Sequence, residues 1–292
     1  MAHPARRLPQ NIAGDFFVDE SCIDCDACRQ IAPRTFRDHG EQSSVYRQPE
    51  TDEETRQTLK ALVACPTGSI GTTRRHDTRA AVEAFPELIE GNVYFCGFTA
   101  ESSFGAWSYL VVRPAAEGGN VLVDSPRFSR PLVKRIEALG GVRTIFLTHR
   151  DDVADHEAFA RRFGAARVMH ADDHAARHGV ERVIVGTDEA RLDEEFRIIP
   201  TPGHTRGHMV LLYRDKYLFT GDHLAWSPRR DTLTSFRNAC WYSWAEQTRS
   251  MERLLDYSFE WVLPGHGRIH RDEAAAMREH LRGCVEWMKA TP

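Results

Sequence analysis

From residue 92 onward, the chain alternates between short apolar runs and polar segments that contain glycine or proline. The runs are rich in Val, Ile, Phe and Tyr, a pattern that predicts β-strands. They are NVYFCGF (92–98), WSYLVVR (107–113), NVLVDSP (120–126), VRTIFLTH (142–149), ARVMH (166–170), FRIIPTPGH (196–204), MVLLYRDKYLFTGDH (209–223) and WVLPGHG (261–267). Helical periodicity lies between some of them, in RPLVKRIEALGG (130–141) and HEAFARRFG (156–164). The alternation predicts an α/β domain.

The first 75 residues have a different texture. Their clearest element is TDEETRQTLKALVAC (51–65), a predicted helix with Thr51 or Asp52 as its cap and acidic residues in its first turn. A polar stretch that contains Pro86 follows. We therefore expect a small α+β domain over residues 1–75, a linker over 76–90 and the α/β domain over 91–292.

Composition narrows the class of protein. The formal net charge is −4, and the Arg-Arg pairs are scattered, so nothing indicates a nucleic-acid surface. No apolar stretch reaches the ~20 residues of a membrane helix, and the first residues lack the apolar segment of a secretion signal. The seven cysteines are odd in number and uneven in spacing, which argues against a disulfide scaffold. We expect a cytoplasmic protein that acts on a small molecule; the sequence does not predict its oligomeric state.

Four cysteines form a metal-binding pattern in the first domain. Cys22, Cys25 and Cys28 follow C-x2-C-x2-C, and Cys65 precedes a proline. This motif resembles single-cluster ferredoxins, because the position of a fourth cysteine for a second cluster is Ala32. The resemblance implies a [4Fe–4S] cluster on all four thiolates, or a three-iron form if one ligand is lost. The alternative is a structural zinc ion.

His and Asp residues follow four of the predicted strands, in THRDDVADH (148–156), TPGHTRGH (201–208), FTGDH (219–223) and LPGHG (263–267). Their order resembles that of the metallo-β-lactamase superfamily. The resemblance implies an αβ/βα sandwich whose loops hold one or two divalent metals, zinc or iron, with manganese as a further option. It also implies that Asp222 bridges the metals. The implied ligands are His149, Asp151, Asp155, His156, His204, Asp222 and His266.

The segment 148–156 departs from the family pattern His-x-His-x-Asp-His in two ways. An aspartate, Asp151, occupies the second position, and the final pair Asp155-His156 arrives two residues late. A two-residue insertion would keep all four residues available. Aligning the family motif from His149 without an insertion leaves one metal site nearly complete and the other without some of its ligands. Asp152 would then be an alternative ligand to Asp151. A carboxylate in place of an imidazole shifts the preference from zinc toward iron or manganese.

The resemblance predicts a function at the level of chemistry. A glyoxalase II-like hydrolase would act on a thioester, lactone or related acyl compound, with Asp155 and Asp222 as catalytic residues. The alternative is an iron-dependent oxidoreductase that receives electrons from the cluster and reduces oxygen, nitric oxide or sulfur species, and an electron-transfer partner would then supply the cluster. The third option is a redox sensor without catalysis.

Overall fold

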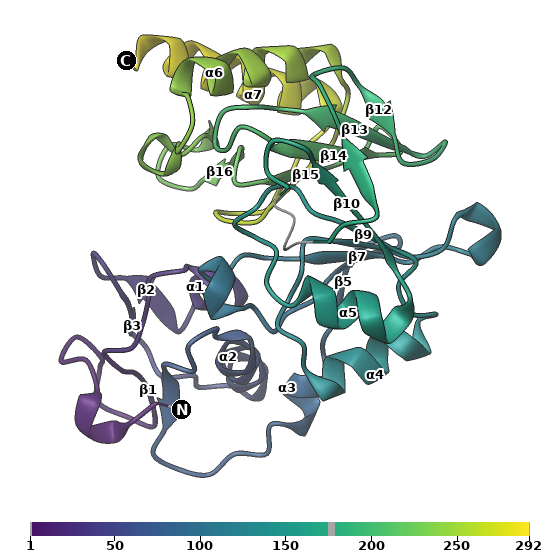
Figure 1. Ribbon diagram of the computed structural model, residues 1–292. Helices are drawn as coiled ribbons and strands as arrows, with labels where there is room; N and C mark the ends of the chain where they lie inside the picture. Colours follow the sequence, from purple (N-terminus) through teal and green to yellow (C-terminus); the bar gives the residue numbers. More distant parts are fainter. Residues whose placement is uncertain (1, 175–178, 292) are drawn as a thin grey trace. The chain divides into compact units, whose positions relative to one another are not determined.

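The computed structural model describes residues 2–174 and 179–291 (Figure 1). The chain divides into two compact units. The N-terminal unit comprises Met1–Val142 and Ala154–Phe163, and the C-terminal unit comprises Arg143–Val153 and Gly164–Pro292. These boundaries differ from the expected linker at residues 76–90, and the division of the chain into domains at that linker remains a prediction.

The cysteine-rich part of the N-terminal unit combines short strands with two helices. The helix expected over residues 51–65 is confirmed as α2, and Thr51 is its N-cap, since its hydroxyl accepts a hydrogen bond from the Glu54 N–H at 3.1 Å. Antiparallel pairs join β1 to β4 and β2 to β3. The elements are β1 (Phe16–Val18), α1 (Ala27–Ile31), β2 (Phe36–Asp38), β3 (Ser43–Val45), α2 (Asp52–Ala64) and β4 (Ile70–Thr72).

The remainder of the N-terminal unit contains antiparallel strands and three helices. Strands β5, β6, β7 and β8 pair in sequence order. Two of the elements, α3 and β5, lie within residues 76–90, where the sequence predicted only a connection. The elements are α3 (Arg79–Glu83), β5 (Glu87–Glu90), β6 (Val93–Phe95), β7 (Tyr109–Val111), β8 (Val121–Val123), α4 (Arg130–Ala138) and α5 (His156–Phe163).

The C-terminal unit contains a parallel set of strands, β9, β10 and β11, and a second sheet in the order β12-β13-β14-β15-β18-β19. All five residues of β14 are buried, as are all five of β15. The strands are β9 (Thr144–Phe146), β10 (Ala166–His170), β11 (Arg182–Ile184), β12 (Ala190–Arg191), β13 (Phe196–Pro200), β14 (Met209–Tyr213), β15 (Tyr217–Gly221), β18 (Trp261–Pro264) and β19 (His270–Arg271).

Two helices and a strand pair complete the C-terminal unit. Helices α6 (Trp244–Arg253) and α7 (Ala274–Ala290) lie side by side (Figure 1), and α7 also packs against β17. Strands β16 (Ala225–Ser227) and β17 (Thr232–Thr234) form an antiparallel ribbon. Met277, Leu281, Cys284, Val285 and Met288 of α7 enter a hydrophobic core that they share with residues of the second sheet. Because a buried Leu or Met stabilises by ~1.5–3 kcal/mol, this apolar face holds α7 in place.

Candidate metal centre

The candidate ligands of the C-terminal unit lie in loops that follow strand ends. His149, Asp151 and Asp152 follow β9, and His204 follows β13. Asp222 comes directly after β15, and His266 follows β18. Strands β15 and β18 are parallel neighbours, so the loops after them leave the sheet at the same edge. The sheet therefore brings residues that are far apart in sequence to one place.

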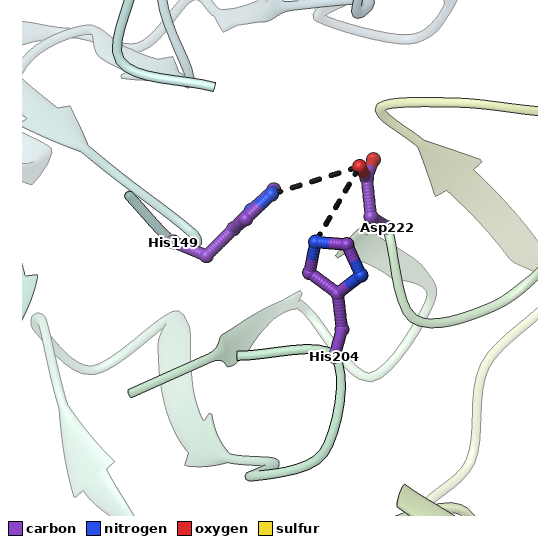
Figure 2. A group of neighbouring side chains, drawn as sticks. All are labelled: His149, His204 and Asp222. Atoms are coloured by element: carbon purple, nitrogen blue, oxygen red, sulfur yellow. Dashed lines mark ion pairs between the residues drawn. The ribbon is translucent and has the colours of Figure 1, made fainter. Parts of the chain in front are cut away.

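His149, His204 and Asp222 form the first ligand cluster (Figure 2). Nε2 of His149 lies 3.6 Å from Oδ2 of Asp222, and Nε2 of His204 lies 3.7 Å from the same oxygen. Asp151 adds a fourth donor, because its Oδ2 lies 3.3 Å from Nε2 of His204 and 3.9 Å from Nε2 of His149. Ligand atoms around a tetrahedral ion with bonds of ~2.0–2.2 Å lie ~3.3–3.6 Å apart. The distances from Asp222 to His149 and His204 are close to this spacing, and Asp151 approaches the two histidines without belonging to the group whose ligand atoms all lie within 4.8 Å of one another.

Asp152, Asp222 and His266 form a second ligand cluster. Nδ1 of His266 lies 2.7 Å from Oδ1 of Asp222. Asp222 therefore presents one carboxylate oxygen to each cluster: Oδ2 faces the two histidines of the first, and Oδ1 faces His266. The 2.7 Å contact with His266 is a direct hydrogen bond, shorter than the spacing of two ligand atoms on one ion, so the bridging role of Asp222 remains a prediction.

Two glycines allow the backbone to approach these side chains closely. A Cβ on Gly265 would lie 2.5 Å from Oδ2 of Asp152 and 2.9 Å from Oδ1 of Asp222. A Cβ on Gly221, whose φ is +48°, would lie 2.6 Å from Oγ1 of Thr148. A Cβ at either position would force a neighbouring side chain to move, so the two glycines permit the tight packing around the carboxylates.

Two carboxylates of the centre, those of Asp151 and Asp222, are held ionised. Burial by itself raises the pKa of Asp222, but the nearby His266 and His149 outweigh it, and the pKa lies well below its usual value. A hydrogen bond from His204 lowers the pKa of Asp151, against an opposing contribution from burial. Ionised carboxylates and imidazole nitrogens are the N/O donors that zinc, iron and manganese accept. The chemistry of the residues thus fits a metal centre.

Further polar residues orient these ligands. Oγ1 of Thr148 lies 2.9 Å from Nδ1 of His149, a contact that leaves Nε2 facing Asp222. His208 and His223 are fully buried with stacked rings 4.5 Å apart, and Oγ1 of Thr201 lies 2.9 Å from Nδ1 of His208. Burial lowers the pKa of both histidines well below the usual value, so they are neutral near pH 7.

Asp173 joins two ligand loops, a role that the sequence analysis missed. Its buried carboxylate accepts hydrogen bonds from the Thr205 hydroxyl at 2.5 Å, the Gly207 N–H at 2.8 Å and the Arg150 N–H at 3.2 Å. It therefore connects the loop of His204 to the loop of His149. Nothing local in HADDH, where Asp173 occurs, distinguishes it from a surface aspartate.

The structure brings together five of the seven predicted metal ligands, His149, Asp151, His204, Asp222 and His266, and adds Asp152. Asp155 and His156 belong to neither cluster within the described residues. Oδ2 of Asp155 accepts a hydrogen bond from the Phe128 N–H at 2.7 Å, and its carbonyl accepts one from the Ala158 N–H at 2.9 Å. His156 is the first residue of α5. Their assignment as ligands, and that of Asp155 as a catalytic residue, remains a prediction.

The four cysteines of the N-terminal unit line one small cavity together with polar residues such as Ser43 and Thr67. Cys22 and Cys25 precede α1, Cys28 lies within it, and Cys65 caps α2. In the described part of the chain, no group of three or more ligand atoms within 4.8 Å of one another includes a cysteine. Sulfurs on one zinc ion with bonds of ~2.3 Å would lie ~3.8 Å apart. In the described part of the chain, three or more of these sulfurs are therefore not gathered as closely as one zinc ion would require.

Burial around the cysteines opposes the free thiolate form. It raises the pKa of Cys25 to about 12, and it also raises the pKa of Cys22 and of Cys28. These sulfurs therefore become thiolates when a cation binds them, as coordination by iron achieves. The backbone is shaped for this role, because Asp24 and Asp26 have positive φ values of 59° and 65° that wind the chain between the cysteines.

Comparison with known proteins agrees with this geometry. The family model described as "4Fe-4S single cluster domain of Ferredoxin I" matches residues 18–72, and the one described as "Metallo-beta-lactamase superfamily" matches residues 103–266. Two crystal structures show the same fold. The DIM-1 metallo-β-lactamase has a TM-score of 0.52 and 18% identity over 69% of this chain and 95% of that one. VMB-1 has a TM-score of 0.51 and 15% identity over 70% of this chain and 96% of that one. The predicted fold class is confirmed.

Curated relatives match a shorter region. Hydroxyacylglutathione hydrolase of Rhodospirillum rubrum is 31% identical over 119 residues, which are 39% of this chain and 46% of that protein. The enzyme of the same name from Fuscovulum blasticum is 37% identical over 129 residues, 39% of this chain and 47% of that protein. The chain thus spans about half the length of the curated relatives it matches. Among the described residues, no helix is both long and apolar enough to cross a bilayer. The chain belongs to the metallo-β-lactamase superfamily and carries a single-cluster 4Fe-4S ferredoxin domain ahead of its metallo-β-lactamase domain.

Proposed function

We propose that the protein is a metal-dependent hydrolase of thioesters, lactones or related acyl compounds. The observation that carries the proposal is the shared use of Asp222, whose two oxygens face two sets of candidate ligands. The relatives named hydroxyacylglutathione hydrolase support a thioester as the substrate class.

The residues divide into two ligand sets. His149, Asp151, His204 and Asp222 would hold one ion, and Asp152, Asp222 and His266 would hold the other. Divalent ions in such a centre polarise a carbonyl group and lower the pKa of bound water to ~7, which supplies a nucleophile at neutral pH. Asp151 has 41% of its side chain exposed while His149 has none, so substrate would approach from the side of Asp151.

The test is hydrolysis of a hydroxyacylglutathione by protein with its metals and cluster loaded. Loss of a residue that only hydrogen-bonds to a metal ligand lowers activity by up to ~100-fold. We expect Asp222→Asn to lower kcat/KM by more than this and to release metal. Asp215→Asn is the matched control, because Asp215 is 53% exposed and pairs with Arg197. Absence of turnover on thioesters, lactones and esters by the loaded wild-type protein would contradict the proposal.

The structure also gives a reason to consider the oxidoreductase. Asp151 supplies a hard carboxylate oxygen to the first cluster, a donor that favours iron or manganese over zinc. A [4Fe–4S] cluster on Cys22, Cys25, Cys28 and Cys65 would then pass electrons from a redox partner to an iron centre that reduces oxygen. The test is to reduce the iron–sulfur cluster, add oxygen and monitor its reoxidation by visible absorbance. Equal reoxidation rates in the wild type and Asp222→Asn would exclude this function.

A further inference from the structure

Three side chains of the C-terminal unit form another group of ligand atoms, separate from the two clusters that share Asp222. His270 lies in β19, Asp272 follows it, and His280 lies in α7. One ligand atom from each residue lies within 4.8 Å of the others. The three residues are neither fully buried nor fully exposed, so an ion can reach them from solvent.

The geometry orients all three groups. Nε2 of His280 lies 3.5 Å from Oδ2 of Asp272, within the spacing of ~3.3–3.6 Å that ligand atoms adopt around a tetrahedral ion. Oγ1 of Thr232 lies 3.3 Å from the other nitrogen of His280, Nδ1. Such a contact holds the proton on Nδ1 and leaves Nε2 as the ligand atom, as the outer partners of metal-bound histidines commonly do.

His270 has a nitrogen without a protein partner. Its ring stacks on Trp226 with the centroids 3.5 Å apart and the planes 6° from parallel, and it meets the ring of His280 edge-on at 5.7 Å. Nε2 of His270 is buried and has no hydrogen-bond partner among the described residues. A buried imidazole nitrogen without a partner is costly unless something binds it. Burial, together with His280, lowers the pKa of His270.

We propose that His270, Asp272 and His280 bind a divalent transition-metal ion, with Zn²⁺ as the best match. Two imidazoles and one carboxylate are a ligand set that zinc accepts, and a water molecule would complete a tetrahedral shell. Mg²⁺ and Ca²⁺ prefer sites made of oxygen, so they fit this nitrogen-rich group poorly. The proposal is independent of the reaction at Asp222.

The position of the group gives the ion a structural role. Trp226 lies in β16, four residues after Asp222. Its backbone N–H donates to the carbonyl of Arg268 at 3.0 Å. Arg268 and His270 lie in the segment that leads away from His266. An ion held by His270 and His280 would therefore tie α7 to the loop of Asp222 and to the loop of His266. An ion that binds only the folded state raises the thermal stability of the protein.

The experiment counts ions on protein whose cluster and Asp222 centre are already loaded. We expect elemental analysis after dialysis against sub-stoichiometric Zn²⁺ buffer to give one more ion per chain in the wild type than in His280→Ala. Asp272→Asn preserves the shape of a partly exposed side chain and should weaken Zn²⁺ binding at least ~10-fold in competition with a chromophoric chelator. His39→Ala is the control, because His39 is an exposed histidine of the N-terminal unit.

A second measurement reports on the position of the ion. Because Trp226 stacks on His270, Cu²⁺ added to the loaded protein should quench tryptophan fluorescence. We expect the quenching to be lost in His280→Ala and in Trp226→Phe, and to be retained in His39→Ala. Equal zinc contents and equal quenching in the wild type, His280→Ala and Asp272→Asn would overturn the proposal, whether or not the protein hydrolyses any substrate.

Discussion

Gly265→Ala tests whether close backbone approach sets the geometry of the metal centre. The added Cβ would lie 2.5 Å from Oδ2 of Asp152 and 2.9 Å from Oδ1 of Asp222, distances at which at least one carboxylate must move. Overpacking of this kind costs ~1–3 kcal/mol. If that strain falls on the metal-bound state, metal affinity drops ~5–150-fold, since each ~1.4 kcal/mol is a factor of ten.

The assay is competition with a chelator of known affinity, measured on the apo protein of the wild type and the variant. Gly283→Ala is the matched control: the same substitution is made within α7, where a Cβ would meet nothing within 4 Å. It should leave metal affinity unchanged and stabilise the fold by ~0.5–1 kcal/mol, because alanine is the better helix former. A Gly265→Ala variant with metal affinity within twofold of the wild type would refute the reasoning.

The remaining predictions concern other contacts. Asp173→Ala should lower the free energy of unfolding by ~2–4 kcal/mol in urea denaturation, because it leaves buried donors of two ligand loops without an acceptor; an unchanged midpoint would contradict this. Cys65→Ser should remove most of the visible absorbance of the anaerobically purified protein, and a full spectrum would show that Cys65 is not a ligand. Burial raises the pKa of Asp15, but a hydrogen bond with His76 and backbone donors bring it down to about 2. This depressed pKa contributes ~2 kcal/mol of stability above pH ~4, which is lost as the pH falls toward 2. Denaturation of Asp15→Asn should lack that pH dependence, and an unaltered profile would place its origin elsewhere.

Part of the candidate site was predictable from local sequence. Cys22, Cys25 and Cys28 are close in the chain, so their spacing alone indicates one site. His204, Asp222 and His266 each follow an apolar run, and strand ends are where a sheet gathers ligands. Glycine next to these residues signalled close backbone approach, which Gly221 and Gly265 show.

Only the tertiary structure shows which residues of 148–156 lie near Asp222. The sequence favoured Asp151 and Asp155 and offered Asp152 only as an alternative to Asp151. The choice depends on where α5 begins and on the hydrogen bond between Asp155 and the backbone of Phe128, a residue 27 positions earlier. Such a partner cannot be read from local spacing, because it forms only when distant segments pack together.

The same reason explains two features without any motif. Asp173 joins the loops of His149 and His204, and His280 meets His270 only because α7 packs beside the β16–β17 ribbon. The sequence by itself determined the two kinds of metal chemistry, the α/β fold and the order of the ligand loops, since these depend on local periodicity and residue type. The tertiary structure decided which candidate ligands lie close together and which residues hold them, because non-local packing and hydrogen bonds fix those positions.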